Sequence, residues 1–544
     1  MTTDVTAPVT EPAPAPPMTK PRWWPLPSSI GLGVVLQAIV SVLFAENLSY
    51  LVFASLFIVW PLVVFLLLLW WIFWSRFTWS ICNNGLAVVV SLFVAFVAIV
   101  RFDEFDGAMM PHFSWRWRPT ARALSQEYFK NRTAAPVAEN REPIEPETVI
   151  PKTADWSEFR GSNRDDVVVG ETLRTGFDTR PAKQLWKQPI GLGWGTFSVV
   201  GERAFTIEQR SQQELTVCYD IESGRELWTH SDEIRFESVQ GGNGPRATPT
   251  LHGGKVFSQG GTVILNCLDA RTGSKIWTRN ILDDAGTINL PWGQAGSPLI
   301  VEDLVIVSPG SNDAAGKAKK SAVIAYRSET GEKVWSSGDR YGSYSSPQLV
   351  TLNELPQILV FDGVGLMSLA PKTGELLWQF AWANTPQINA AQPMKIDDST
   401  VLIGTGYGLG SACLSVKRAA GTASWSVEPK WTSKQFKLKF NSAVRHGDFA
   451  YGLDEGLLTC LSLVDGKRRW KQGRYGYGQM QLVGDTLLIL SEEGDVVLVA
   501  ATPERSRELA RFHAIDGKTW NHPVLSRGRL LVRNSDEAAC YDLR

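Results

Sequence analysis

Ten polar or aromatic side chains stand in short tracts that precede apolar stretches, and together they could form a ligand site. The tracts include EQR (208–210), GPRATP (244–249), PWGQAGSP (291–298), SYSSP (343–347) and NAAQP (389–393). The guanidinium group of Arg246 could anchor an anion, because it holds a carboxylate or phosphate through two parallel hydrogen bonds. The candidate ligand-binding residues are Gln209, Arg210, Arg246, Thr248, Trp292, Gln294, Ser345, Asn389, Gln392 and Asn441.

The same tracts have a second interpretation. Four of them end in a similar pattern before proline, a small residue in three and Gln392 in NAAQP, which indicates one repeated turn. Hydroxyl and amide side chains in such turns commonly bond neighbouring backbone groups. The ten residues could therefore hold the fold together instead of binding a ligand, and the sequence leaves both interpretations open.

Other chemical signals exclude several function classes. The six histidines are scattered without the spacing of a zinc site, so we assign neither a metal ligand nor a catalytic residue. The 544 residues carry 54 Lys+Arg and 55 Asp+Glu, a net charge of -1. That balance argues against a nucleic-acid partner bound through a basic surface.

Three apolar stretches, at about 29–45, 50–74 and 79–100, predict membrane-spanning helices after a Pro-rich disordered tail (1–28). The first stretch could alternatively be the apolar part of a signal peptide. We expect an anchor over 29–101, a juxtamembrane segment and linker over 102–179, and a repeat domain over 180–544. The Pro/Glu-rich part of the linker is interpreted as a spacer between bilayer and domain.

The basic residues near the stretches predict the orientation. Lys20 and Arg22 precede the first stretch and Arg76 lies between the second and third, whereas the loop 45–50 has no Lys or Arg. Basic residues favour the cytoplasmic side. We therefore expect a multi-pass protein of the bacterial inner membrane, with everything after about residue 101 in the periplasm.

A repeat from about residue 180 predicts the fold. Its unit combines apolar residues, a glycine-containing turn and a tryptophan, as in CYDIESGRELW (218–228) and CLDARTGSKIW (267–277). The tryptophan position recurs every 39 to 58 residues, which suits four short strands per unit and a propeller blade. The structural tryptophans are Trp186, Trp228, Trp277, Trp335, Trp378, Trp431 and Trp470, and Phe512 takes the last place.

Counting units predicts eight blades, one of them split between distant parts of the chain. The terminal CYDLR (540–544) is half a unit, and its missing strand is KQLW, which ends at Trp186. Pairing the two parts would close the ring and leave no sheet edge unpaired. We expect each tryptophan to pack between neighbouring blades and not to contact a ligand.

Two further patterns concern the repeat domain and the linker before it. Cys218, Cys267, Cys413, Cys460 and Cys540 occupy equivalent positions on different blades, so we expect small buried core residues and no disulfides. The tract FRGSNRD (159–165) brings Arg160, Asn163 and Arg164 close together. It could bind the linker to the propeller or contact a partner, and we favour the first.

These residues resemble a known family. The repeat, clearest in CLDARTGSKIW, is similar to the tryptophan-docking repeat of the pyrroloquinoline quinone (PQQ) propellers, and DWSEFRGSNRDDVV (155–168) resembles the segment that precedes such propellers in bacterial members. The resemblance implies an all-β, eight-bladed propeller behind three transmembrane helices. The family includes quinone-dependent dehydrogenases and a non-enzymatic propeller of outer-membrane assembly.

The family's cofactor is not carried over residue by residue. Its alcohol dehydrogenases stack PQQ under an adjacent pair of cysteines and hold a calcium ion, and this chain has no two neighbouring cysteines. The cofactor is therefore unknown, although PQQ with Ca²⁺ stays open. We expect a non-enzymatic scaffold that binds a protein partner or small molecule at the propeller face. The alternative is a PQQ-dependent membrane-bound dehydrogenase that oxidises an alcohol or sugar.

Overall fold

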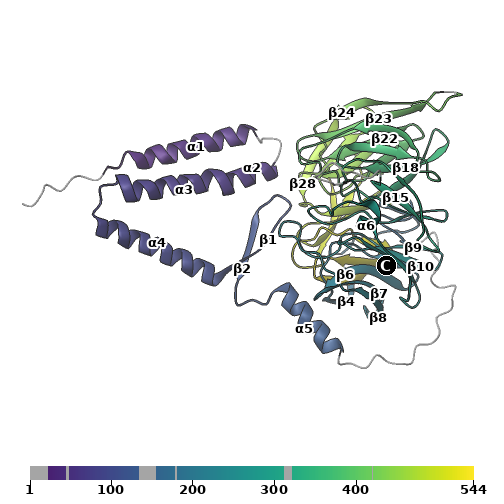
Figure 1. Cartoon of the computed structure of the whole chain (residues 1–544), viewed down its shortest axis with the longest axis horizontal. Coiled ribbons are helices and arrows are strands. Elements are labelled where there is room, and N and C mark those ends of the chain that lie inside the picture. Colours follow the sequence, from purple (N-terminus) through teal and green to yellow (C-terminus); the bar gives the residue numbers. More distant parts are fainter. Residues whose placement is uncertain (1–21, 44–47, 134–154, 178–179, 312–320, 420) are drawn as a thin grey trace, which may run out of the picture. The chain divides into compact units, whose positions relative to one another are not determined.

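The computed structural model describes residues 22–43, 48–133, 155–177, 180–311, 321–419 and 421–544. Residues 1–21 of the expected disordered tail (1–28) and most of the Pro/Glu-rich spacer lie outside these residues. The end of the expected tail, Pro25–Ser28, is instead the start of the first helix. The chain forms two compact units. One contains residues 1–103 and 108–117, and the other contains residues 104–107 and 118–544 (Figure 1).

The first unit contains the apolar helices. They are α1 (Pro25–Leu43), α2 (Leu48–Ala54), the π-helical turn η1 (Ser55–Val59), α3 (Trp60–Leu69), the π-helical turn η2 (Trp70–Trp74) and α4 (Trp79–Ile99). Three stretches, Pro25–Leu43, Leu51–Trp74 and Trp79–Ile99, are long and apolar enough to cross a membrane, as the sequence predicts. Pro61 lies at the start of α3, next to η1, where its missing N–H interrupts the regular helix. A two-stranded sheet, β1 (Val100–Phe105) and β2 (Pro111–Trp115), follows α4.

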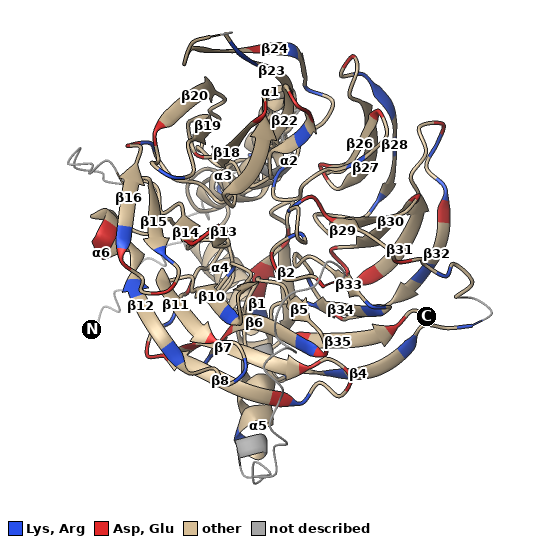
Figure 2. Ribbon diagram, turned by 90° about the vertical axis from the view of Figure 1, so that its right-hand side faces the viewer, with Lys and Arg blue, Asp and Glu red and all other residues tan. Residues whose placement is uncertain are grey.

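The second unit is an eight-bladed β-propeller, which confirms the predicted fold. Figure 2 shows its four-stranded sheets arranged in a ring around a common centre. Blades 1 to 4 are β5 (Ser198–Val200), β6 (Arg203–Arg210), β7 (Gln213–Asp220), β8 (Glu226–Asp232); β9 (Thr250–His252), β10 (Lys255–Gln259), β11 (Ile264–Asp269), β12 (Lys275–Asn280); β13 (Leu299–Val301), β14 (Leu304–Val307), β15 (Val323–Arg327), β16 (Lys333–Ser337); β17 (Gln348–Leu352), β18 (Leu355–Phe361), β19 (Gly365–Leu369) and β20 (Leu376–Ala381).

The other four blades repeat this pattern. They are β21 (Met394–Asp397), β22 (Thr400–Thr405), β23 (Gly410–Arg418), β24 (Trp425–Ser433); β25 (Val444–His446), β26 (Phe449–Asp454), β27 (Leu457–Ser462), β28 (Arg468–Arg474); β29 (Gln479–Val483), β30 (Thr486–Leu490), β31 (Asp495–Ala500), β32 (Glu508–His513); and β33 (Val524–Ser526), β34 (Arg529–Arg533), β35 (Glu537–Asp542) with β4 (Lys183–Pro189). The remaining elements of this unit are α5 (Ala121–Thr133), α6 (Ile281–Ala285) and β3 (Val167–Val168).

Burial along the strands explains their sequences. Middle strands such as β14 (LVIV) are buried on both faces, because each blade packs between two others, and they are therefore continuously apolar. Outer strands such as β12 (KIWTRN) bury the tryptophan and expose most of their other side chains. The cores lie between successive blades, so each blade depends on its neighbours for burial.

The ring closes through a strand from far upstream. β4 pairs antiparallel with β35, with Trp186 opposite Cys540 and Gln184 opposite Tyr541 (Figure 2). The Tyr541 hydroxyl also bonds the Gln184 side chain at 3.3 Å. This pairing confirms the split eighth blade.

Most glycine turns of the repeat receive a tryptophan from the preceding blade. The indole N–H groups of Trp186, Trp228, Trp277, Trp335, Trp431 and Trp470 donate to carbonyls of the next blade at 2.8–3.1 Å. The rings lie on the turn glycines: a Cβ added to Gly224, Gly273, Gly331, Gly374 or Gly466 would come within 2.4–2.7 Å of the tryptophan. The glycine in the repeat is therefore required by the tryptophan of the blade before it.

Two positions depart from this pattern. Trp378 donates instead to Gln357 of its own blade at 2.7 Å, because the next blade carries the longer turn KRAAGTASW. Phe512 replaces tryptophan in blade 7, where it packs against Phe177 and Tyr541 with ring centroids 5.1 Å apart. The blade that follows is the split one, whose β35 and β4 are not joined by a turn.

All six cysteines are free and buried, as expected from their positions. Burial raises the pKa of the Cys413 and Cys460 thiols to about 11. Thiols that stay protonated at neutral pH are poor nucleophiles, so these residues serve as small core side chains.

Candidate functional site

The segment 155–168 occupies the centre of the propeller. Its backbone bonds Val199 of blade 1 and Leu251 of blade 2, and its last residues, β3, add a parallel strand to β29 of blade 7. A segment that contacts blades on different sides of the ring must lie near the ring axis. The linker is therefore bound to the propeller through this tract.

Two arginines of FRGSNRD anchor the segment. Arg164 donates to the carbonyls of Pro298 and Pro347, in blades 3 and 4, and pairs with Glu158 at 2.6 Å. Arg160 donates to the carbonyl of Ala443 at 3.0 Å, before blade 6, and pairs with Asp166. Both arginines are almost completely buried. Their planar, multi-donor groups therefore connect three blades, 3, 4 and 6, through one short segment.

Asp166 supplies the negative charge that this arrangement requires. Burial opposes ionisation of its carboxyl, but the charges of Arg160 and then His522 outweigh burial and lower its pKa below the ordinary value. The Arg160–Asp166 pair is thus ionised at neutral pH. A buried pair of this kind is costly to break, because the remaining charge has no water to solvate it.

A belt of hydrogen bonds joins the blades just before their first strands. A backbone N–H of one blade donates to a hydroxyl of the next at 2.9–3.2 Å. The pairs are Thr196 to Thr248, Thr248 to Ser297, Ser297 to Ser346, and Gln392 to Ser442. The Gln392 amide, oriented by its surroundings, donates to the carbonyl of Ser346 at 2.9 Å and accepts from its N–H at 2.9 Å and from the hydroxyl of Ser345 at 3.2 Å. The belt follows the repeated small-residue turns seen in the sequence.

Most other predicted ligand residues also bond the propeller itself. Gln294 donates to Pro309 O at 2.9 Å, Asn389 to Asp362 O at 2.7 Å and Asn441 to Leu453 O at 2.9 Å. Gln209 accepts from the N–H of Phe236 at 2.7 Å, and Trp292 donates to Gln240 at 3.3 Å.

Arg246 is held by its own loop. Its guanidinium donates to the carbonyls of Gly241, Gly242 and Gly244 at 2.6–2.8 Å and stacks over the Phe236 ring. Burial lowers its pKa to about 10. These contacts fit the turn-stabilising interpretation, and a ligand-binding role for the ten residues stays a prediction.

Aromatic rings gather beside the belt and were not among the predicted site residues. The rings are Trp194, Phe440, Tyr477 and Trp520, and each precedes by two residues the position that starts the belt in its blade (196, 442, 479 and 522). Ring centroids lie 5.0 Å apart for Trp194 and Trp520, 5.0 Å for Trp520 and Phe440, and 5.1 Å for Phe440 and Tyr477. The missed sequence signal was this repeated aromatic, which precedes the small residue in several blades. We call these four rings, with Lys439, Lys518 and Glu492, the mouth cluster.

The cations of the mouth cluster lie against the rings. Lys439 Nζ is 4.8 Å from the centre of Tyr477, and Lys518 Nζ is 4.1 Å from that of Trp520. Burial lowers the pKa of both ammonium groups, that of Lys439 to about 8, although nearby carboxylates such as Glu492 oppose the shift. Such desolvated cations favour an environment that supplies carbonyls, carboxylates or π faces.

A cavity of about 260 Å³ lies between α5 and blade 1. It is lined by Ser125, Gln126, Phe129, Lys130, Leu192, Gln209, Arg210, Ser211 and Arg235. Arg210, one of the predicted residues, stacks 3.7 Å from the Phe129 ring and pairs with Glu208 and Glu226. The lining contains no carboxylate that could serve a calcium ion.

These features do not fit PQQ with its calcium ion, because a planar aromatic tricarboxylate needs a flat slot. The hollow beside blades 3 and 4, near Arg340, Asp362 and Ser345, measures about 10 Å³ and suits a single water. Within the residues described by the structure, no group of three or more His, Cys, Asp or Glu side chains could hold a metal ion. We therefore derive no redox step.

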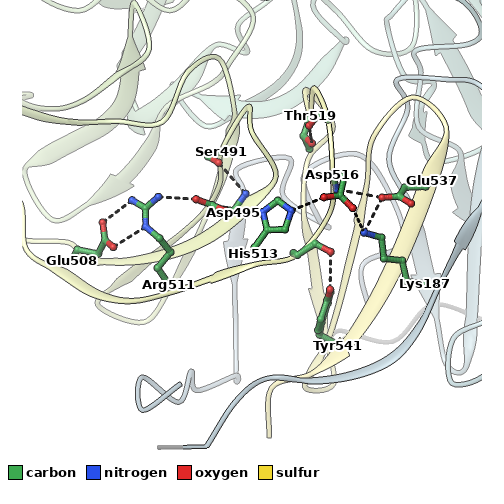
Figure 3. Close-up of polar contacts among 12 residues, drawn as sticks. Lys187, Ser491, Asp495, Glu508, Arg511, His513, Asp516, Thr519, Glu537 and Tyr541 are labelled. Carbon is green, nitrogen blue, oxygen red and sulfur yellow. Dashed lines mark hydrogen bonds and ion pairs between the residues drawn. The ribbon is translucent and has the colours of Figure 1, made fainter. Parts of the chain in front are cut away.

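A chain of charged groups crosses the junction of blades 7 and 8 (Figure 3). His513 bonds Asp495 through Nδ1 at 2.9 Å and Asp516 through Nε2 at 3.0 Å. Lys187 of β4 pairs with Asp516 at 2.7 Å and Glu537 at 3.0 Å, which ties the closing strand to the same network. Hydrogen bonds to the carboxylates of Asp495 and then Asp516 favour the charged imidazolium and raise the pKa of His513.

We expect this network to strengthen the junction mainly at low pH. A histidine whose pKa is raised by folding stabilises the folded state fully when the pH is below the ordinary pKa of about 6.5. This stabilisation is lost as the pH rises through the folded-state pKa. Because the His513 side chain is 53% exposed, the effect should stay below about 1 kcal/mol. Urea unfolding of a His513→Gln variant should show a loss at pH 5.5 and almost none at pH 9. An equal loss at both pH values would contradict this prediction.

Comparisons with known proteins agree with the fold. A family model described as outer membrane protein assembly factor BamB matches residues 170–316 and 216–472, together more than half of the chain. The 1-butanol dehydrogenase (cytochrome c) of Thauera butanivorans is 33% identical over 93 residues, 17% of this chain and 13% of that protein. The quinohemoprotein alcohol dehydrogenase ADH IIB of Pseudomonas putida is 29% identical over 139 residues, 24% of this chain and 19% of that protein.

The matches to these curated relatives thus span less than a fifth of either relative's length. Among solved structures, quinohemoprotein alcohol dehydrogenase from Comamonas testosteroni superposes with a TM-score of 0.51 at 13% identity, covering 78% of this chain and 83% of that one. At this identity the similarity shows the fold alone.

Proposed function

Because the chain belongs to the PQQ-like propeller family represented by the outer membrane protein assembly factor BamB, we propose that its propeller is a protein-docking scaffold held at a membrane by the three apolar helices. A scaffold needs a rigid frame and an exposed binding face. Chemistry at a central cofactor is not part of this proposal.

The hydrogen bonding near the axis of the propeller is the main support for this proposal. The arginines of segment 155–168 bond carbonyls of blades 3, 4 and 6 near the axis. The belt residues before the first strands bond the neighbouring blades. Polar groups that could hold a small substrate are thus already used by the protein, whereas the mouth cluster offers rings and cations suited to a peptide.

The proposed location follows from the apolar helices and the basic residues near them. With Lys20, Arg22 and Arg76 on the cytoplasmic side, three crossings would put the propeller in the periplasm of a bacterium, next to the inner membrane. The docked partner would then be another periplasmic or membrane protein.

Two measurements on the detergent-solubilised full-length chain test this function. The tagged chain should co-purify with a protein partner at a fixed stoichiometry, and an unrelated tagged membrane protein should not. Added PQQ with Ca²⁺ should leave the melting temperature unchanged, whereas a ligand at 100 times its Kd would add about 2.7 kcal/mol and raise it by several degrees.

The dehydrogenase alternative predicts the opposite outcome. It is supported by the short matches to two proteins named as dehydrogenases. A rise in melting temperature with PQQ and Ca²⁺, together with alcohol- or sugar-dependent dye reduction, would replace the scaffold proposal. A chain that purifies alone and gains nothing from PQQ would contradict both functions.

A further inference from the structure

The residues Glu104–Gly107 lie on the mouth cluster and belong to the propeller unit. Lys439 Nζ donates to the carbonyl of Gly107 at 2.7 Å. Lys518 Nζ donates to the carbonyl of Phe105 at 2.9 Å and pairs with the Glu104 carboxylate at 2.6 Å. Each buried lysine of the mouth cluster is therefore bonded by this four-residue turn, which we call the tip.

Glu492, the acidic residue of the mouth cluster, also bonds the tip. Glu492 accepts the backbone N–H of Gly107 at 2.8 Å and the indole N–H of Trp520 at 2.7 Å through Oε1. Its Oε2 accepts the N–H of Tyr477 at 3.0 Å. The mouth cluster therefore hydrogen-bonds both the N–H and the carbonyl of Gly107, as peptide-binding sites do with the main chain of their ligands.

The lysines make the mouth cluster depend on an occupant. Both are largely buried, with Lys439 7% exposed and the Lys518 side chain also 7% exposed. Rings stabilise them in part, but a buried ammonium group also needs acceptors to replace water. The tip supplies two carbonyls and one carboxylate, and another peptide of the same chemistry could do the same.

Glycine is required at the last position of the tip. A Cβ on Gly107 would lie 2.2 Å from Cδ2 of Tyr477, well inside van der Waals contact. The mouth cluster thus selects a turn that ends in glycine and carries a carboxylate three residues earlier. Any side chain at position 107 should expel the tip without altering the mouth cluster itself.

We propose that the mouth cluster is a binding site for an acidic, glycine-ended peptide turn of a partner protein, and that the tip Glu104–Gly107 is an internal ligand that such a turn displaces. This inference rests on the proposed docking function and specifies its site and partner chemistry. Because the tip is tethered, it competes at an effective concentration of the order of millimolar, so weak free peptides are excluded until it leaves.

The test uses the full-length protein and a fluorescent peptide with the sequence of residues 101–110, RFDEFDGAMM. Gly107→Val should bind this peptide about tenfold or more tightly than the unaltered chain, the factor expected when a millimolar tip competes with a peptide of Kd about 0.1 mM. Glu104→Ala, which removes one contact of the tip and adds no bulk, should give a smaller gain in affinity. Fluorescence anisotropy of the labelled peptide measures the binding.

Three controls distinguish binding at the mouth cluster from nonspecific attraction between opposite charges. Adding Lys518→Ala to Gly107→Val should abolish binding, whereas Lys255→Ala, which removes a surface lysine paired with Glu329, should not. A peptide with Gln and Asn in place of its acidic residues should bind poorly. Equal affinity of the unaltered chain and both tip variants, or binding that persists without Lys518, would overturn the inference.

The outcome also distinguishes this inference from the docking function. If a partner co-purifies equally with the unaltered chain and with Lys518→Ala, and no peptide binds Gly107→Val, docking stands and the mouth site fails. If the peptide binds Gly107→Val through Lys518 but no partner is found, the site stands and the docking function fails.

Discussion

Replacing Gly331 with alanine should lower the free energy of unfolding by about 2–5 kcal/mol. Gly331 has φ +69°, a left-handed conformation that costs a side-chain-bearing residue about 1–2 kcal/mol. Its new Cβ would also lie 2.7 Å from the Trp277 ring, and overpacking of this kind costs about 1–3 kcal/mol. Urea unfolding of the purified full-length protein measures the change.

Gly254 provides the matched control for this prediction. It has φ +75°, but no atom lies within 4 Å of the position that its Cβ would take. Gly254→Ala should therefore cost only the backbone term, about 1–2 kcal/mol. If both variants lose the same stability, tryptophan docking between blades contributes nothing and the account of the repeat is wrong.

Replacing Asp166 with alanine should destabilise the propeller by about 3–5 kcal/mol. The change leaves the Arg160 guanidinium charged and buried beside the axis, because both side chains of the pair are 1% exposed. Arg160 also holds the carbonyl of Ala443, so movement of its side chain loosens segment 155–168 from blade 6. The change in unfolding free energy and faster proteolysis of this segment are the measurements.

A surface pair gives the contrast. Asp303 pairs with Arg327 at an exposed position, where ion pairs contribute about 0–1 kcal/mol. Asp303→Ala should therefore be nearly neutral. A loss for Asp166→Ala no larger than for Asp303→Ala would mean that the central segment does not hold the ring together.

The propeller could be predicted from the sequence because most blades repeat the same short sequence pattern. Apolar middle strands, a turn glycine and a docking tryptophan recur together, and the half unit at Cys540 points back to Trp186. Blade 5 repeats the pattern less clearly because its turn KRAAGTASW is longer, and Trp378 of blade 4 bonds Gln357 of its own blade instead. Local repetition therefore reveals the architecture even where one copy deviates.

The site was harder to predict because it depends on contacts between distant residues. The sequence marked the belt tracts correctly as recurrent but could not decide whether Thr248 or Gln392 would bond a ligand or the next blade. Nothing in the sequence around Lys439 and Lys518 indicates that they are buried, because their burial depends on rings from several blades and on Glu104–Gly107. No spacing along the chain reveals such a cluster.

The pairing of β4 with β35 has a consequence for biogenesis. β4 is synthesised long before its partner β35, so the ribosome must add residues 190–536 before the circle can seal. Until then β4 presents an unpaired edge that invites aggregation or capture by a chaperone. Premature termination just before Glu537 should therefore yield an unstable, protease-sensitive product even though seven blades are complete.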